Sequence, residues 1–355
     1  MKKRLMVLVL VTTMLMAGVL SACSSKESDK DTKDTSKAAQ EKTVQKNHSS
    51  EKKKVVLNEV AHSIFYAPMY IAIEEGYFAE EGIDLELVTG FGADKTMTAV
   101  LSGNADIGFM GSEASIYTYN EGASDYVVNF AQLTQRAGNF LVAREKNDDF
   151  SWENLKGKEV LGGRKGGMPE MVFEYILKEN GLDPAKDLSI DQSIDFGSTA
   201  AAFSGGKGEF TVEFEPAATT LEKNGDGFVI ASLGVDSGYV PYTSYSAKTS
   251  YVEKHPEIIQ AFTDGLQKGV DYVNSHTAEE IAKVIQPQFK ENDPDTITRI
   301  VERYQSQDTW KENLVFEKES FELLQDILES AGELEKRADY EKLVTTIYAK
   351  EAMKK

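Results

Sequence analysis

The feature that most constrains the fold is a regular alternation of β-rich runs and helical stretches after the first fifty residues. Apolar runs at 55–60 and 83–88 flank a segment of helical pattern at 68–75. A second unit with the same rhythm covers 158–233, and from residue 251 onward the pattern is almost wholly helical. Strands and helices that alternate in this way build parallel sheets covered on both faces. We therefore expect an α/β fold with two halves and a helical C-terminal region.

The first 22 residues have the pattern of a secretory signal. A basic start is followed by an uncharged apolar stretch at 5–20 and by Leu20-Ser21-Ala22-Cys23. This ending resembles a bacterial lipobox, in which the cysteine is lipidated, and we expect lipidation of Cys23. The alternative is an uncleaved membrane helix, but the apolar stretch is shorter than the ~20 residues that span a bilayer.

Residues 23–51 are predicted to form a flexible tether behind the lipid anchor. Val44 is the one large aliphatic residue in 24–51, so this segment cannot bury enough apolar surface to fold. Cys23 is also the only cysteine of the chain. That count excludes an internal disulfide, a cysteine nucleophile and thiolate metal sites.

Charge and motif content narrow the classes of function. The formal net charge is −19, which argues against nucleic-acid binding because that function needs a basic surface. The sequence contains no G-x-S-x-G, H-E-x-x-H or G-x-x-x-x-G-K-[ST] motif. We therefore expect a protein that is not an enzyme and that holds no metal and no cofactor.

Three junctions from strand to helix are candidates for ligand binding. They are GFMGSE at 108–113, GGRKGGMPE at 162–170 and FGST at 196–199. Open α/β sheets bind ligands at the carboxyl ends of their strands, and free amides at a helix start can face a ligand. For the junction at 162–170, a tight turn without a ligand remains the alternative. The residues predicted here are Gly111, Ser112, Glu113, Gly166, Gly167, Glu170, Phe196 and Thr199.

Four segments resemble the substrate-binding proteins of bacterial ABC importers, in the branch that serves nitrate, sulfonates, taurine and thiamine-pyrimidine precursors. They are APMYIAIEEGYFAEEGIDLELV (67–88), MTAVLSGNADIGFMG (97–111), ENLKGKEVLGGRKGGMPE (153–170) and FEP (214–216). The resemblance implies a two-lobed fold of the type II periplasmic-binding-protein kind. Lobe one would contain 54–143 and 244–350, and lobe two 144–243, with the chain crossing at 139–143 and 242–246.

The same resemblance implies a setting and partners. We expect a monomer on the outer face of the cytoplasmic membrane, of the Gram-positive type, held by the lipid. Its partners would be a small-molecule ligand, an ABC permease and the ATPase of that permease. An envelope signalling or adhesion module with the same fold remains the alternative class.

The ligand is predicted from the aromatic and acidic residues near the seam. Phe65, Tyr66, Phe196 and Tyr242 could stack on a flat, nitrogen-bearing heterocycle, and Glu215 or Glu170 could accept its hydrogen bonds. The alternative is a sulfonate, taurine or nitrate bound near Arg164 and Lys165. A thiamine-pyrimidine synthase of the same fold is the enzyme alternative, but the cysteine-rich motif that marks it is missing.

Overall fold

The computed structural model describes residues 52–355 except residue 195, and it does not describe the side chain of Phe196. The predicted signal (1–22), the tether (23–51) and Cys23 lie outside the described residues. Within the described part of the chain, no helix is long and apolar enough to cross a membrane.

The first sheet has five strands in the order β2-β1-β3-β10-β4. They are β1 (Lys53–Glu59), β2 (Ile83–Thr89), β3 (Ile107–Gly111), β4 (Val127–Thr134) and β10 (Thr243–Lys248). β1 pairs in parallel with β2 and β3, so the carboxyl ends of these three strands lie at one edge.

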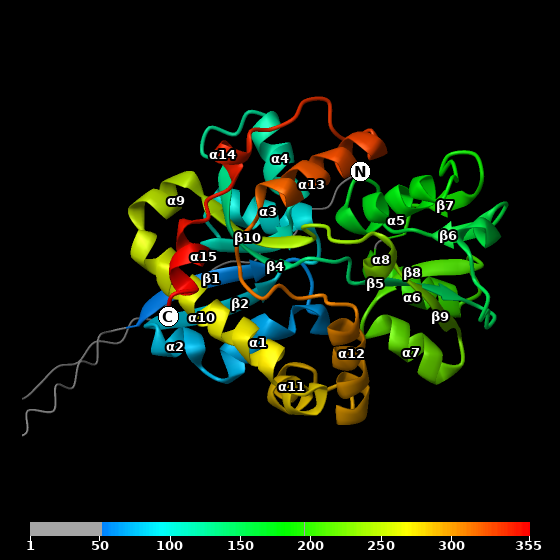
Figure 1. Ribbon diagram of the computed structural model, residues 1–355, viewed down its shortest axis with the longest axis horizontal. Coiled ribbons are helices and arrows are strands. Elements are labelled where there is room, and N and C mark those ends of the chain that lie inside the picture. The colour runs from blue at the N-terminus through cyan, green and yellow to red at the C-terminus, as the bar shows by residue number, and fades with distance from the viewer. Residues whose placement is uncertain (1–51, 195) are drawn as a thin grey trace, which may run out of the picture. The chain divides into compact units, whose positions relative to one another are not determined.

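The second sheet repeats this plan with the order β7-β6-β8-β5-β9. Its strands are β5 (Asn139–Ala143), β6 (Glu159–Leu161), β7 (Ser189–Asp191), β8 (Phe210–Phe214) and β9 (Phe228–Ser232). β6 pairs in parallel with β7 and β8. Figure 1 shows the two sheets as separate groups of strands, each with its own helices. The predicted α/β fold with two halves is thus confirmed.

Each sheet contains one strand that runs against both of its neighbours, and that strand directly follows a crossing of the chain. β5 is antiparallel to β8 and β9, and β10 is antiparallel to β3 and β4. The sequence placed 139–143 at the end of lobe one, whereas these residues form β5 in the second sheet. The first crossing is therefore the short segment 135–138, between β4 and β5.

The helices of the two halves follow the strands as the alternation predicts. In the first half they are α1 (Ala67–Glu74), α2 (Tyr77–Glu80), α3 (Ala93–Ser102) and α4 (Glu113–Asn120), with the 3-10 turn η1 (Ile64–Tyr66) before α1. In the second half they are α5 (Met168–Glu179), α6 (Thr199–Ser204), α7 (Ala217–Asn224) and α8 (Leu233–Asp236), with the 3-10 turns η2 (Trp152–Leu155) and η3 (Phe196–Ser198).

After β10 the chain is helical, as predicted. Its elements are α9 (Thr249–Lys254), α10 (Pro256–Ser275), α11 (Ala278–Ile285), η4 (Gln286–Gln288), α12 (Pro294–Ser306), α13 (Lys318–Ala331), α14 (Tyr340–Leu343) and α15 (Ile347–Ala352). α10 packs closely on α1 because Gly269 has no side chain: a Cβ there would lie 2.2 Å from the carbonyl oxygen of Pro68.

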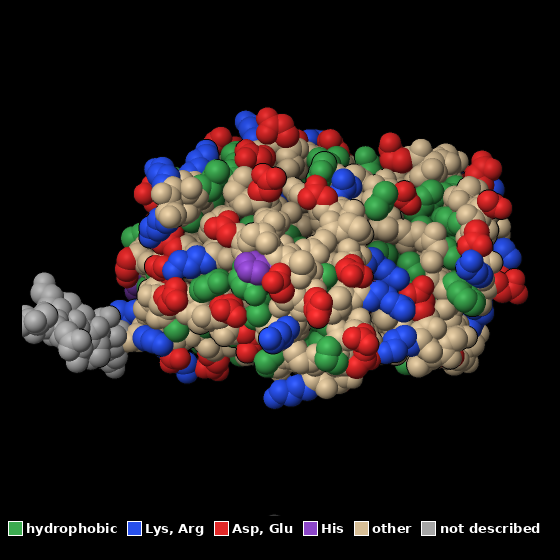
Figure 2. All heavy atoms as spheres, turned by 60° about the horizontal axis from the view of Figure 1, so that its bottom comes forward, with side chains coloured by type: hydrophobic (Ala, Val, Ile, Leu, Met, Phe, Trp, Pro, Cys, Tyr) green, Lys and Arg blue, Asp and Glu red, His purple; other side chains and the backbone are tan. Residues whose placement is uncertain are grey.

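This helical region, assigned to lobe one from the sequence, also contacts the second half. Arg303 of α12 forms an ion pair with Glu222 of α7 at 2.9 Å. Lys178 of α5 donates a hydrogen bond to the backbone oxygen of Ser330 in α13. The face shown in Figure 2 carries acidic, basic and apolar side chains interspersed.

Candidate ligand site between the two sheets

Two of the predicted junctions, 108–113 and 162–170, lie close together where the two halves face each other, since the Met168 amide acts on the Glu113 carboxyl group. The hydroxyl of Ser63, in the loop after β1, donates a 2.7 Å hydrogen bond to the backbone oxygen of Glu215 at the end of β8. The hydroxyl of Tyr117 in α4 donates a 3.1 Å bond to the backbone oxygen of Gly166, in the loop before α5. We call this contact region, between the strand ends of the two sheets, the seam.

An aromatic cluster fills one side of the seam. The ring of Phe65 is fully buried, and its centroid lies 5.2 Å from Tyr66, 5.5 Å from Phe214, 5.7 Å from Tyr242 and 5.3 Å from Tyr304. This ring is therefore a core element that holds strands and helices of both halves together. Such pairs add about 0.5–1.5 kcal/mol each beyond their buried area.

Phe65 also explains a glycine in the first crossing. A Cβ at Gly138 would lie 2.4 Å from the Phe65 ring, which is closer than real Cβ atoms come. The indole nitrogen of Trp310 donates a 2.9 Å bond to the backbone oxygen of Phe65. The surrounding rings, the close approach of Gly138 and the bond from Trp310 to the backbone hold Phe65 in the core, so this residue is a packing residue and not the predicted ligand-stacking one.

Glu113 is the first residue of α4, and its carboxyl group is buried without a complete set of partners. The residue is 2% exposed, and its Oε2 atom has no hydrogen-bond partner among the described residues. A Cβ at Gly111 would lie 2.1 and 2.6 Å from the two carboxyl oxygens, so the group folds back over the end of β3. Burial raises the pKa of Glu113 to about 7, and the backbone amides of Glu113 and Met168 oppose this rise.

Hydroxyl groups beside Glu113 also lack partners in the described part of the chain. They are Ser112 Oγ and Tyr242 Oη, on residues only 1% and 2% exposed. Thr243 pairs with Gly111 across β10 and β3, which brings Tyr242 next to Ser112. Leaving a buried polar group unpaired costs about 1–3 kcal/mol, so such atoms call for a functional or structural explanation.

Glu170 has partners in its own half. Its carboxylate accepts a 3.1 Å bond from the Gly166 amide and a 2.6 Å bond from the side-chain amide of Gln192. Burial and the neighbouring Glu174 raise its pKa. Gly166 has a φ of 74°, a conformation that favours glycine, and Gly167 precedes the first turn of α5. Glu170 therefore holds the loop before α5 in place.

Glu215 forms a structural ion pair with Arg303. It was predicted to accept hydrogen bonds from the ligand, but its carboxylate is already bonded within the protein. Its Oε1 accepts bonds from Arg303 and from the Thr219 hydroxyl, and its Oε2 accepts a 2.9 Å bond from the Thr219 amide. Burial raises its pKa, and the Arg303 charge opposes that rise. The group thus stabilises the start of α7 and ties it to α12.

Glu213 lies on the same face of β8 as Thr211, because side chains two residues apart in a strand point the same way. The Thr211 hydroxyl donates a 2.6 Å bond to Glu213 Oε1. Burial raises the pKa of Glu213 to about 7, and bonds from Thr211 and Thr199 oppose the rise. Thr199, a predicted ligand residue, is fully buried and already bonded. Across residues 52–194 and 196–355, no group of three His, Cys, Asp or Glu side chains could hold a metal ion.

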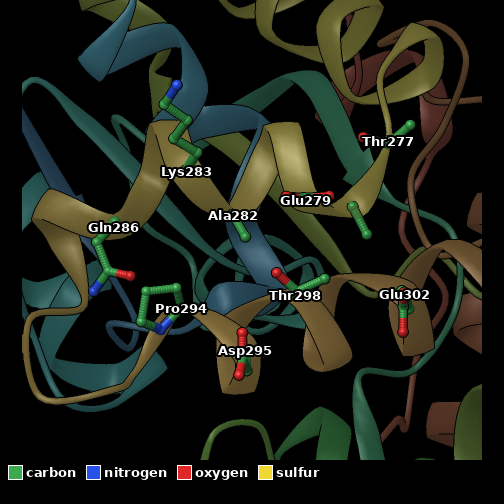
Figure 3. A pocket seen from close by; sticks show the side chains of 10 residues that line it. Thr277, Glu279, Ala282, Lys283, Gln286, Pro294, Asp295, Thr298 and Glu302 are labelled. Carbon is green, nitrogen blue, oxygen red and sulfur yellow. The ribbon is translucent and has the colours of Figure 1, made fainter.

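Two open grooves lie away from the seam. One has a volume of about 720 Å³ and runs between α11 and α12, where Figure 3 shows exposed Glu279, Lys283, Asp295 and Glu302 at its rim. The other, of about 460 Å³, lies in the second half beside Trp152 and Asp236. We place the candidate site at the seam because a buried carboxyl group and two buried hydroxyl groups without partners among the described residues, on Glu113, Ser112 and Tyr242, belong to it.

Sequence reasoning missed Asn139, Phe214 and Tyr304. Asn139 opens β5, it is fully buried, and neither its side-chain oxygen nor its nitrogen has a partner among the described residues. The sequence signal for Asn139 was a polar residue at the first position of the otherwise apolar strand NFLVA. Phe214 and Tyr304 gave no such signal, because their place around Phe65 depends on distant segments.

The fold defines the class of this protein: a two-lobed periplasmic-binding-protein fold. The alkanesulfonate-binding protein SsuA of Xanthomonas axonopodis pv. citri, bound to MOPS, superimposes with a TM-score of 0.68 at 15% identity, covering 84% of this chain and all of that one. The nitrate-binding protein NrtA of Synechocystis PCC 6803 gives a TM-score of 0.66 at 16% identity, covering 86% and 89%.

Sequence comparison then identifies the family. The chain belongs to the NMT1/THI5-like family, whose profile matches residues 64–280. It is 47% identical over 291 residues to YtlA of Bacillus subtilis (strain 168), described as a candidate binding protein, covering 82% of this chain and 87% of that protein. A more distant relative, at 23% identity over 60% of this chain and 64% of that protein, is the 4-amino-5-hydroxymethyl-2-methylpyrimidine phosphate synthase of Aspergillus parasiticus. The family resemblance predicted from the motifs is confirmed.

Proposed function

We propose that the protein is the solute-binding component of an ABC importer, which captures a small molecule in the seam and delivers it to a permease. The observation that carries this proposal is the group of buried, unpartnered polar atoms on Ser112, Glu113 and Tyr242. A bound solute between the lobes would satisfy them. The 47% identity to a binding protein over most of both chains supports this class.

The ligand we propose is a small, flat, nitrogen-bearing heterocycle, such as an aminopyrimidine precursor of thiamine. Tyr66 and Tyr242 are buried aromatic residues at the seam, which a ligand could reach once the lobes open, and Glu113 offers an acceptor for ring amino groups. The family relative from Aspergillus parasiticus is named for an aminopyrimidine compound, which points the same way. That relative is an enzyme, but we assign this chain binding and no catalysis.

A second candidate ligand is a sulfonate or nitrate, because neighbours with this fold bind those anions. Arg164, next to the seam, is the cation that favours this alternative, although it lies 4.0 Å from Asp94 in an ion pair.

Calorimetric titration with 4-amino-5-hydroxymethyl-2-methylpyrimidine and with taurine separates the two ligands. We expect the aminopyrimidine to bind and Tyr66→Ala to weaken it at least tenfold. Tyr119→Ala, which changes a tyrosine of α4 away from the aromatic cluster, is the matched control and should have no effect. Binding of taurine alone, undisturbed by Tyr66→Ala, would contradict the heterocycle assignment.

The proposed anchor is a lipid on Cys23, which would keep the protein at the outer face of the cytoplasmic membrane. We expect Cys23→Ala to release the protein from membranes into the medium. If the variant stayed in the membrane fraction, residues 5–20 would be acting as a membrane helix instead. A separate experiment distinguishes transport from an envelope signalling role. Cells that lack the protein should lose uptake of the bound compound if the protein serves transport.

A further inference from the structure

The start of α4 differs from an ordinary anion-binding helix terminus. Free amides and the helix dipole usually make such a terminus favourable for negative charge. Here the carboxyl group of Glu113 occupies it, because the side chain folds back over Gly111, close to its own backbone amide. A ligand that carried a full negative charge would have to lie beside this buried carboxyl group.

The groups around Glu113 are suited to a ligand that donates hydrogen bonds. Glu113 Oε2 is buried and has no partner in the described part of the chain. Ser112 Oγ and Tyr242 Oη, which can donate or accept, belong to residues that are neighbours across β3 and β10, and both are unpartnered among the described residues. The charge of Glu113 also acts on the Tyr242 hydroxyl. From the second half, Arg164 and the Met168 amide act on Glu113, so this carboxyl group faces the other lobe across the seam.

The other acidic groups of the seam are less available. Glu215 is bonded to Arg303 and Thr219, and Glu170 is bonded to Gly166 and Gln192. Glu213 is bonded to Thr211. Glu113 is the one of these four for which the described residues provide no side-chain partner.

We infer that Glu113 determines specificity: it makes the seam accept a neutral or cationic compound with N–H donors and reject fully ionised anions such as sulfonates. This inference rests on the proposed solute-binding function and deepens it, since it names the residue that selects the ligand class. It also separates the protein from the anion-binding neighbours that share its fold. The raised pKa of Glu113 agrees with this role. Burial disfavours the charged carboxylate, and a ligand that supplies an N–H donor or a positive charge would stabilise that charge.

The test uses two probes of opposite character on the purified protein. The probes are 4-amino-5-hydroxymethyl-2-methylpyrimidine, which carries an amino group, and methanesulfonate, which carries a negative charge at all pH values used. Calorimetry measures both with the wild type, Glu113→Gln and Glu113→Ser. The matched control is Glu121→Gln, which neutralises an exposed carboxylate at the other end of α4.

We expect the wild type to bind the aminopyrimidine and to show no binding of methanesulfonate. Glu113→Gln should weaken the aminopyrimidine at least tenfold. Glu113→Ser, which removes the carboxyl group from the helix start, should allow methanesulfonate to bind. Glu121→Gln should match the wild type with both probes. Unfolding by urea, followed for each variant, verifies that the variants are folded.

Several results would overturn the inference. Tighter binding of methanesulfonate than of the aminopyrimidine by the wild type is one, and unchanged aminopyrimidine affinity in Glu113→Gln is another. A wild type that bound neither probe would also overturn the ligand class stated here. In that case the proposed function would still stand if a compound released from the freshly purified protein bound back to it, and it would fall if none did.

Discussion

At the scale of single residues, the carboxyl group of Glu113 makes the stability of the ligand-free protein depend on pH. Its pKa is raised from 4.5 to about 7 by burial, so between these values the folded state binds more protons than the unfolded state. Stability must then fall as pH rises from about 4.5 to about 7, by at most about 3 kcal/mol for this group.

Replacing Glu113 by Gln should remove part of this slope. We expect the free energy of unfolding of Glu113→Gln to exceed that of the wild type at pH 8 and to approach it at pH 5. Glu213, with a pKa raised to about 7, should retain its own share of the slope. Urea unfolding at several pH values measures the difference, with Glu121→Gln as the control. A variant less stable than the wild type at pH 8 would show that Glu113 is a satisfied structural group.

His62 should give a second pH-dependent contribution. Its Nδ1 lies 2.9 Å from Glu59 Oε1, and its Nε2 lies 2.9 Å from the backbone oxygen of Gln288. The bond to Glu59 raises the pKa of His62, burial opposes the rise, and the Gln288 oxygen and the Glu291 charge support it. Tyr70, whose hydroxyl lies 3.1 Å from Nδ1, also donates to Glu59. The charged ring thus links the loop after β1 to η4.

Because the folded pKa is raised, this contribution is fully present below the unfolded value of about 6.5 and is lost as pH rises through the folded value. We expect His62→Gln to cost about 1 kcal/mol at pH 5.5 and less at pH 9, measured by urea unfolding. His255→Gln, on the surface, is the control. An equal loss at both pH values would mean that packing on Phe289, and not charge, is what His62 provides.

Sequence alone pointed to some residues of the candidate site and not to others, for a physical reason. Ser112 and Glu113 were predicted because a glycine-ended strand before a helix start is a local pattern. Phe65 and Glu215 were predicted to contact the ligand, but in the structure Phe65 packs on Tyr304 and Glu215 pairs with Arg303. Both of these partners come from α12, which is far away in the sequence. Such partners are set by tertiary packing, which local patterns do not contain.

At the scale of elements, α12 stabilises the start of α7 through one buried ion pair. Glu215 is fully buried, and Arg303 reaches it from α12 with its side chain 22% exposed. Removing one partner of a buried pair typically costs about 3–5 kcal/mol, since the other charge stays uncompensated. We expect Arg303→Met to destabilise the protein by roughly this amount.

The double variant gives the sharper version of this prediction. Arg303→Met combined with Glu215→Gln should be more stable than Arg303→Met alone, because no buried charge is then left without a partner. Arg299→Met, on the exposed face of the same helix, should have little effect. Unfolding in urea measures the wild type, Arg303→Met, Glu215→Gln, the double variant and Arg299→Met. Strictly additive single effects would contradict the coupling.

The elements themselves were largely predictable, but their pairing was not. The alternation of strands and helices gave the two α/β halves and the helical C-terminal region. It did not show that β5 enters the second sheet, nor that β5 and β10 run against their neighbours. An apolar strand has the same composition in either sheet and in either direction, so that choice depends on how the chain returns after each crossing.

At the scale of the whole molecule, a ligand in the seam must favour the state in which the lobes are closed on it. Spin labels on cysteines at Lys95 in α3 and Glu179 in α5 report the distance between the halves, in a background with Cys23→Ser. We expect the distance distribution to shorten and narrow when the compound released from the protein is added back. Methanesulfonate should leave it unchanged. If the distance distribution did not change when a ligand was tightly bound, closure of the lobes about the two chain crossings would be contradicted.

The central claim, that this chain captures a solute in the seam, is tested most directly by mass spectrometry of small molecules released when freshly purified protein is denatured. The account predicts one compound in near-equal amount to the protein, bearing N–H donors and lacking a full negative charge. The same compound should be reduced or absent in Glu113→Gln purified in parallel. Release of a sulfonate or nitrate in equal amount would contradict the selection by Glu113, and release of no compound, with none bound back from a cell extract, would contradict the solute-binding account itself.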